Sequence, residues 1–193
     1  MTTKLAQVIE DIDAVNQQDP NKIIVSGSPS SKELLYSRRM SERLSEFEPK
    51  ASEHLSIAAH GQHIARWKIP RSSYEKTRAG YLKWRKDLGV YHGEQLALIM
   101  AARDYSNADI ERVKKIVGKK GIKSDPEIQT LEDVICLVFI EHYLEAFALE
   151  HEKEKIIDII RKTWTKMSDR GQQAALKISL PDQLNLLVGQ ALN

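Results

Sequence analysis

The segment that decides how this chain folds is Ala58–Arg71, which reads AAHGQHIARWKIPR. Two alanines and a glycine near its start carry little side-chain bulk. Close approach of a neighbouring helix would offset the roughly 1 kcal/mol that glycine costs inside a helix. Pro70 biases the residue before it away from helix. We therefore predict a buried helix from Pro49 to about Trp67. The end of this helix would bring imidazole and guanidinium groups together at one edge of the fold.

The remaining chain shows apolar residues at spacings of three and four, the pattern of amphipathic helices. Ser30 with Glu33 matches a capping box at the start of the second helix. Ile23–Val25 is a short extended piece, and we predict no strand pair. The fold class is therefore all-α, a single domain over residues 1–193 with about eight helices. The first helix and a turn-rich linker (1–31) pack on it. The other predicted helices cover residues 3–16, 31–47, 88–103, 107–118, 130–150, 152–167 and the chain after 181.

Bulk composition excludes several classes of protein. The 193 residues carry a net charge of only +2, which gives no global reason to expect a nucleic-acid coat or an acidic partner. The single cysteine, Cys136, cannot form a disulfide within one chain, which favours a reducing compartment. The apolar run around it is too short to span a bilayer. We expect a cytoplasmic protein with no membrane partner.

His60 and His63 are three residues apart, so on one helix they would lie on the same side. Two imidazoles at this spacing can hold a divalent metal, although the HxxH pattern alone is a weak signal. The alternative is one core histidine bonded to backbone and one surface histidine.

A third element adds acidic residues to these histidines. His92 shares a helix face with apolar residues, and Glu132 and Asp133 lie on apolar faces of the longest predicted helix. A buried carboxylate needs a partner. One interpretation is that Asp133 meets His63 and His92 in a metal or proton-transfer site. The other is that both acids favour the first turn of a helix through its dipole.

Residues 66–86 are basic and contain interleaved aromatic residues. Arginine forks bind phosphates and aromatic faces stack bases, so this mixture suits a nucleotide or an RNA backbone. It equally suits a solvated loop whose aromatic residues anchor it to the core. A second basic turn, with Lys119, Lys120 and Lys123, could add to an anion pocket. The basic residues of the first segment are Arg66, Lys68, Arg71, Lys76, Arg78, Lys83, Arg85 and Lys86, and two of its aromatic residues are Tyr81 and Trp84.

Together, these motifs resemble the domain-of-unknown-function family four-two-zero-two. The resemblance extends over nearly the whole chain, and the family name implies no activity. The motifs that carry it are Gln62-His63-Ile64, Arg66-Trp67, Ile69-Pro70-Arg71, Gly80-Tyr81-Leu82, Trp84-Arg85, Gln129-Thr130-Leu131-Glu132-Asp133, Glu141-His142-Tyr143, Lys162-Thr163-Trp164 and Lys166-Met167-Ser168.

The segment Leu55–Ile64 is also similar to the second helix of HD-domain phosphohydrolases, and His92–Leu96 to a later histidine helix of some members. This resemblance implies an HD-domain-like bundle in which His63, His92 and Asp133 hold a divalent metal that activates water against a phosphoester. The chain departs from the pattern because it has no His-Asp dipeptide, and Gln62-His63 occupies its place. The first histidine of the pattern would fall near residues 36–38.

Two main functional hypotheses follow. The first is a metal-dependent phosphohydrolase acting on a nucleotide or similar phosphoester, with Glu132 as base and with Arg66, Arg71 and Lys119 positioning phosphate. The second is a non-enzymatic nucleotide- or RNA-binding module that uses Arg71, Trp84 and Arg85 and in which the HD-like site is degenerate. A third reading is a helical interaction protein whose histidines are all packing residues.

Overall fold

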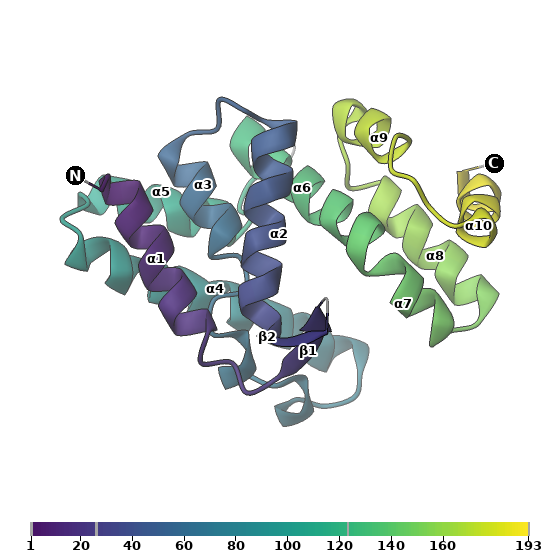
Figure 1. Ribbon diagram of the computed structural model, residues 1–193, viewed down its shortest axis with the longest axis horizontal. Helices are drawn as coiled ribbons and strands as arrows, with labels where there is room; N and C mark the ends of the chain where they lie inside the picture. The colour runs from purple at the N-terminus through teal and green to yellow at the C-terminus, as the bar shows by residue number, and fades with distance from the viewer. Residues whose placement is uncertain (1, 26, 123, 193) are drawn as a thin grey trace. The chain divides into compact units, whose positions relative to one another are not determined.

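The computed structural model describes residues 2–25, 27–122 and 124–192, and most of these residues are helical (Figure 1). The all-α class predicted from the sequence is confirmed. The chain folds into two compact units, Met1–Gly121 and Ile122–Asn193.

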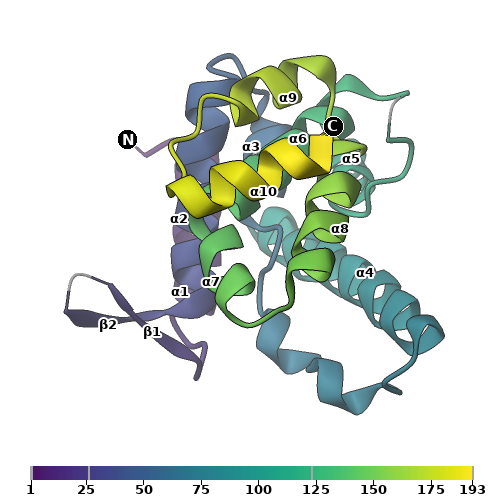
Figure 2. The ribbon, with the colours of Figure 1, turned by 90° about the vertical axis from the view of Figure 1, so that its right-hand side faces the viewer.

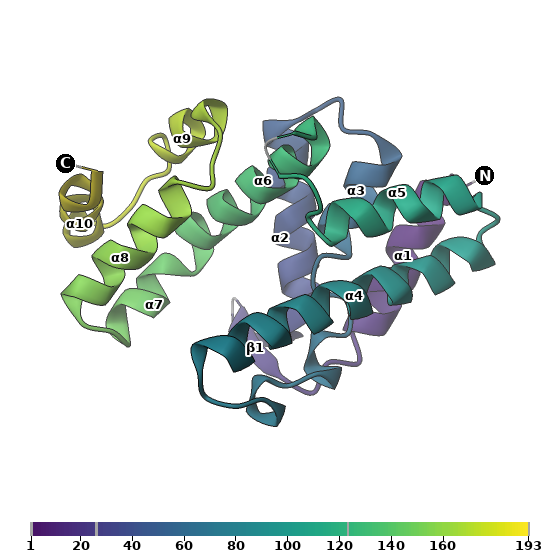
Figure 3. The same ribbon diagram turned by 180° about the vertical axis from the view of Figure 1, so that it is seen from behind.

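The first unit is built from α1 (Lys4–Asn16), α2 (Lys32–Phe47), α3 (Glu53–His60), α4 (Arg78–Ala102) and α5 (Asn107–Val117). Helices α1, α2 and α3 pack on one another, and α5 packs on both α3 and α4. Figure 3 shows α4 and α5 running side by side. Apolar side chains from all five helices form the core of this unit, including Val8, Ile12, Met40, Leu55, Ile57, Leu96, Met100, Val113 and Ile116.

Polar side chains at the helix starts explain where several of these helices begin. The hydroxyl of Ser52 accepts a hydrogen bond from the backbone of Leu55, and that of Thr77 accepts one from Gly80. Ser106 and Asp109 form a capping box at the start of α5. The capping box predicted from Ser30 and Glu33 is wrong. Helix α2 begins at Lys32.

A β-hairpin joins α1 to α2, which corrects the prediction of no strand pair. Strands β1 (Lys22–Val25) and β2 (Ser28–Ser31) are antiparallel, with Lys22 opposite Ser31. Figure 2 shows the two strands close to the start of α2. The second strand reads SPSS, a composition typical of turns, so it gives no strand signal in the sequence.

Two helix boundaries near the segment Ala58–Arg71 also differ from prediction. Helix α3 ends at His60, and a turn followed by two 3₁₀ helices, η1 (Arg66–Lys68) and η2 (Arg71–Ser73), replaces its predicted last two turns. Helix α4 begins at Arg78, ten residues earlier than predicted, because Thr77 caps it. His60 and His63 are therefore not on one helix.

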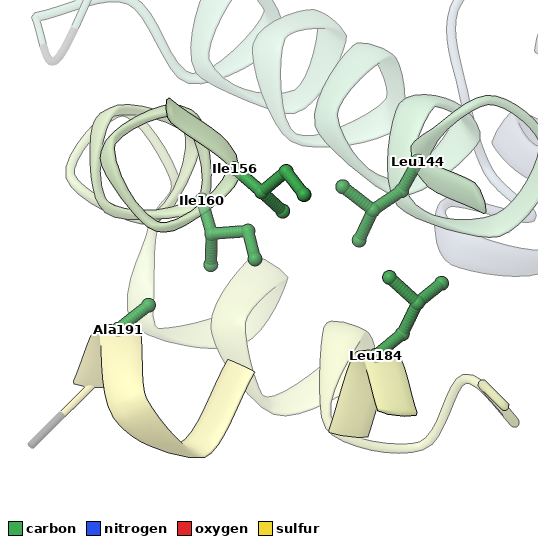
Figure 4. Close-up of a cluster of buried hydrophobic side chains, with 5 residues drawn as sticks. All are labelled: Leu144, Ile156, Ile160, Leu184 and Ala191. Carbon is green, nitrogen blue, oxygen red and sulfur yellow. The ribbon is translucent and has the colours of Figure 1, made fainter. Parts of the chain in front are cut away.

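The second unit contains α6 (Pro126–His142), α7 (Leu144–Leu149), α8 (Lys153–Trp164), α9 (Asp169–Ala175) and α10 (Asp182–Leu192). The predicted helix over 130–150 is interrupted at Tyr143, and α9 was not predicted. Figure 4 shows the cluster that joins α7, α8 and α10 through Leu144, Ile156, Ile160, Leu184 and Ala191. In the described part of the chain, no helix is long and apolar enough to cross a membrane.

Asp133 docks α9 onto α6 within this second unit. Its carboxylate accepts hydrogen bonds from the backbone N–H of Ser168 (2.8 Å), the Ser168 hydroxyl (2.5 Å) and the Gln129 amide (3.1 Å). Gly171 allows this approach, because a Cβ at that position would lie 2.6 Å from Asp133 Oδ1.

We predict that Gly171→Ala lowers the free energy of unfolding by about 1–3 kcal/mol, the usual cost of overpacking. The methyl group would push on a carboxylate that three hydrogen bonds hold in place. The matched control is Gly189→Ala in α10, where an added Cβ meets nothing within 4 Å. That control should leave stability unchanged or raise it by up to about 1 kcal/mol. Urea denaturation measures both, and equal effects would contradict the prediction.

Candidate functional site

The turn after α3 is held in a strained backbone conformation. Ala65 is buried and left-handed (φ 51°, ψ 28°), which is uncommon for a residue other than glycine. Its N–H donates to Oδ1 of Asn16 (3.0 Å), and the amide of that fully buried asparagine donates to the hydroxyl of Ser37 (2.9 Å). Strain of this kind persists only where the surroundings enforce it, and it is frequent at functional sites.

Gly61 begins this turn and confirms the close approach predicted for the segment. A Cβ at Gly61 would lie 2.4 Å from Cδ2 of Leu96 on α4. Ala58 and Ala59 are fully buried beside it. The turn is therefore fixed by packing against α4 as well as by the bond from Asn16.

His63 lies in this turn between an aromatic ring and two opposite charges. Its ring stacks on Tyr36, with centroids 3.9 Å apart and planes at 14°. Nη1 of Arg66 lies 2.8 Å from Nε2 of His63, and Oε2 of Glu33 lies 3.2 Å from Nδ1. The same Arg66 nitrogen lies 3.4 Å from Nδ1, so the carboxylate decides the tautomer. Because a carboxylate can only accept, the proton of the neutral ring is on Nδ1, facing Glu33, and Nε2 accepts from Arg66.

The electrostatic environment of His63 is positive. Burial lowers its pKa well below the ordinary histidine value, and the charges of Arg66, Lys119, Lys32 and Arg85 lower it further. The side chain is still 22% exposed, so it can be reached from solvent. These four cations come from four separate parts of the first unit, namely α2, η1, α4 and the turn after α5.

Glu33 is the carboxylate of this site, and the sequence reasoning missed it. It is buried, burial raises its pKa, and the charge of Arg66 opposes that increase. A signal was present in the sequence, because Glu33 shares the inward face of α2 with Met40, Leu44 and Phe47. A carboxylate on an apolar helix face needs a partner. Lys32, its neighbour, was also not predicted.

His92 lies beside His63, with ring centroids 6.1 Å apart. It is buried, and its Nδ1 donates to the carbonyl oxygen of Ile64 (2.8 Å), so Nε2 of the neutral ring carries the lone pair. Burial first, and then the neighbouring His63, lower its pKa to about 3. The structure therefore places two neutral imidazoles side by side.

The predicted phosphate ligands have different environments. The guanidinium of Arg66 lies over the ring of Trp84, 5.0 Å from its centroid. Trp84 is buried and its Nε1 donates to the carbonyl of Ile69, so its indole is part of the core rather than a platform for a base. Arg85 is exposed and lies over Tyr81.

Arg71 and Lys119 are the remaining predicted phosphate ligands. The Arg71 guanidinium donates to the carbonyls of Tyr74 (2.9 Å) and Glu75 (2.6 Å), which commits it to the loop before α4. Lys119 is half-buried in a left-handed conformation (φ 53°) at the end of α5. Lys123 lies outside the described residues.

His60 has a structural environment separate from His63. Its Nδ1 lies 2.7 Å from Oγ of Ser41, and its Nε2 lies 2.7 Å from Oδ1 of Asp13. The buried ring therefore links α1, α2 and α3. His60 is therefore a core histidine, bonded to two side chains and not to the backbone as the alternative to the metal site supposed.

The predicted acids, Glu132 and Asp133, are both buried and both belong to α6 in the second unit. The oxygens of Asp133 accept the hydrogen bonds from Ser168 and Gln129 that dock α9. Across residues 2–25, 27–122 and 124–192, no three His, Cys, Asp or Glu side chains form a group that could hold a metal ion.

A comparison with protein families shows to which family this chain belongs. A family model described as "Domain of unknown function (DUF4202)" matches residues 6–188, which is almost the entire sequence. The chain belongs to this family. No curated protein and no solved structure matches it. The family resemblance predicted from the motifs is confirmed, and the chemistry must be argued from the site itself.

The buried neutral His92 makes stability depend on pH. The unfolded chain binds a proton on this histidine near pH 6.5 and the folded chain only near pH 3, so protonation favours unfolding between these values. Stability from this residue is complete above pH 6.5 and is lost as the pH falls. From pH 7 to pH 5, we predict a loss of about 2 kcal/mol from His92.

The variant His92→Asn isolates this contribution, since asparagine can still donate to Ile64 but does not titrate. Urea denaturation at pH 7 and pH 5 should show a stability loss about 2 kcal/mol smaller in the variant than in the wild type. Between pH 7 and pH 8 the two proteins should change alike. Parallel curves down to pH 5 would contradict the assignment.

Proposed function

We propose that the first unit binds a phosphorylated small molecule at the edge formed by His63 and Arg66. The observation that carries this proposal is the neutral imidazole of His63, which accepts from Arg66 at 2.8 Å and whose pKa is lowered first by burial and then by four cations. An anion placed there would gain favourable interactions with the same charges that disfavour the imidazolium.

Phosphate suits this edge better than a carboxylate does. Arginine presents a planar fork that binds phosphate oxygens through two parallel hydrogen bonds. Arg66 is positioned for this role by Trp84 on one side and His63 on the other. The positive charges of Lys32, Lys119 and Arg85 would help to neutralise the two negative charges of a phosphate dianion.

The environment of His63 does not fit a divalent cation. Its Nε2 already accepts from Arg66, Asp133 is occupied by Ser168 and Gln129, and the surrounding charges repel a cation. The metal-dependent reaction and the ligand set His63, His92 and Asp133 therefore stay predictions from the sequence, and we assign no step to a metal.

HD-domain likeness also stays a proposal. The resemblance puts the first histidine of the pattern near residues 36–38, where this chain has Tyr36, Ser37 and Arg38 in place of a histidine. In support of the resemblance, Tyr36 from this position stacks on His63. RNA binding through stacked bases gains less support, because Trp84 is buried in the core.

Hydrolysis of the bound phosphoester is the second candidate function. The neutral ring of His63 has its Nδ1 proton directed toward Glu33, the arrangement of a histidine general base held by a carboxylate. Once Arg66 turns to the phosphate, Nε2 would accept a proton from the attacking water. The phosphorus–oxygen bond to the alcohol would break, and the alcohol would leave with that proton.

Calorimetric titration with inorganic phosphate and ribose 5-phosphate tests the binding proposal. We predict that Arg66→Gln weakens binding of both ligands at least about tenfold, equivalent to about 1.4 kcal/mol. The matched control is Arg78→Gln, which removes the same charge from an exposed position of α4. That variant should bind nearly as the wild type does.

Wild-type protein that binds neither ligand, or equal losses in the two arginine variants, would refute the binding proposal. For hydrolysis, His63→Gln should abolish release of alcohol from p-nitrophenyl phosphate while it keeps phosphate affinity within a few-fold. Turnover that survives in this variant would exclude His63 as the base.

A further inference from the structure

Gln62 has a buried side-chain oxygen that lacks a hydrogen bond within the described chain. In the same unit, Nε of Arg43 is also buried without one, but that guanidinium pairs with Glu46 through Nη1 (3.0 Å). Gln62 is 8% exposed, and its Oε1 is buried without a hydrogen-bond donor among the described residues. Burial of an unsatisfied acceptor destabilises a fold, and such groups are few in native proteins. A functional role would explain why the chain tolerates one here.

Several other buried polar side chains of the first unit are satisfied. Asn16 bonds to Ser37 and to the Ala65 backbone, and Asp19 accepts from Asn21 and from the Glu33 backbone. His92 donates to Ile64. Most buried polar groups of the unit are therefore paired, which makes the unpaired oxygen of Gln62 unusual.

Gln62 lies in the same turn as His63 of the proposed phosphate site. Gln62 directly precedes His63, so their Cα atoms are about 3.8 Å apart. Gly61, packed on Leu96, and the strained Ala65 fix the same turn on either side. The conformation of the Gln62 backbone is thus set together with that of His63.

We propose that Gln62 is a specificity residue that recognises a hydrogen-bond donor on the organic part of the phosphorylated ligand. This inference rests on the binding function proposed above and names the class of ligand more closely. The donor is a hydroxyl of a sugar phosphate or an amino group of a nucleotide base. Both place an O–H or N–H beside a phosphoryl group.

Recognition of this kind is selective for a physical reason. A site with an unpaired buried acceptor strongly disfavours an analogue that lacks the matching donor, because the acceptor stays unsatisfied in the complex. Loss of the acceptor should therefore affect the organic phosphates and leave inorganic phosphate unaffected.

The test uses the full-length chain with Gln62→Leu, which keeps similar volume and removes the unsatisfied group. We expect its melting temperature to rise by about 2–4 °C, the shift typical of a small stability gain in a domain of this size. Its affinity for inorganic phosphate should match the wild type. Its affinity for ribose 5-phosphate, or for adenosine monophosphate alone, should fall at least about tenfold.

The two organic ligands identify the donor. A loss with both points to the sugar hydroxyl, and a loss with the nucleotide alone points to the base. The control is Gln129→Leu in the second unit, where the amide donates to Asp133 and to the Lys166 carbonyl. It should lower the melting temperature and leave the binding of all three ligands unchanged.

Two results overturn the inference. If Gln62→Leu melts lower than the wild type and binds every ligand as before, Gln62 is a structural residue, and phosphate binding by the wild type still stands. If the wild type binds none of the three ligands, the proposed function fails and the role of Gln62 fails with it.

Discussion

The buried amide of Asn16 is the constraint on which the candidate site depends. One side chain at the end of α1 donates to Ser37 on α2 and accepts from the backbone of Ala65. It thereby ties two helices to the turn that carries His63. Without that acceptor, the N–H of Ala65 would be buried and unpaired in an already strained conformation. The positions of His63 and Arg66 follow from this bond and from the packing of Gly61.

Burial lowers the pKa values of His63 and His92 most, and the charges around the turn lower that of His63 further. Arg66 occupies the lone pair of Nε2 on His63, and the Ile64 carbonyl fixes the proton of His92 on Nδ1. Glu33 is the buried carboxylate at this point, and it faces the protonated nitrogen of His63. The cations around this turn outnumber its one carboxylate, which leaves an excess of positive charge. A bound dianion would compensate this excess. This imbalance is the physical basis for an anion site.

Much of this arrangement could be predicted from the sequence. The period of the apolar residues predicts most helices, and the small residues at Ala58, Ala59 and Gly61 predict the close helix approach. The sequence grouped His63 and His92 with Asp133, and of these the structure brings His63 and His92 near each other within the first unit. Glu33 was missed because its spacing from Ser30 matched a capping box, although it lies on the apolar face of α2. Asp133 was judged by the same burial argument, but its partner is Ser168, and no local pattern marks a hydrogen bond across 35 residues.

The turn itself could not be predicted, for a related reason. Residues 61–65 continue the composition of α3, and the left-handed conformation of Ala65 depends on Asn16, 49 residues earlier. Local propensity favours more helix here, and a tertiary bond overrides it. In the same turn, Oε1 of Gln62 is buried without a hydrogen-bond donor among the described residues. Strain at Ala65 and an unsatisfied acceptor at Gln62 both lower stability, and both lie within three residues of His63. Two such costs in one short turn are explained more economically by ligand recognition than by independent defects of packing.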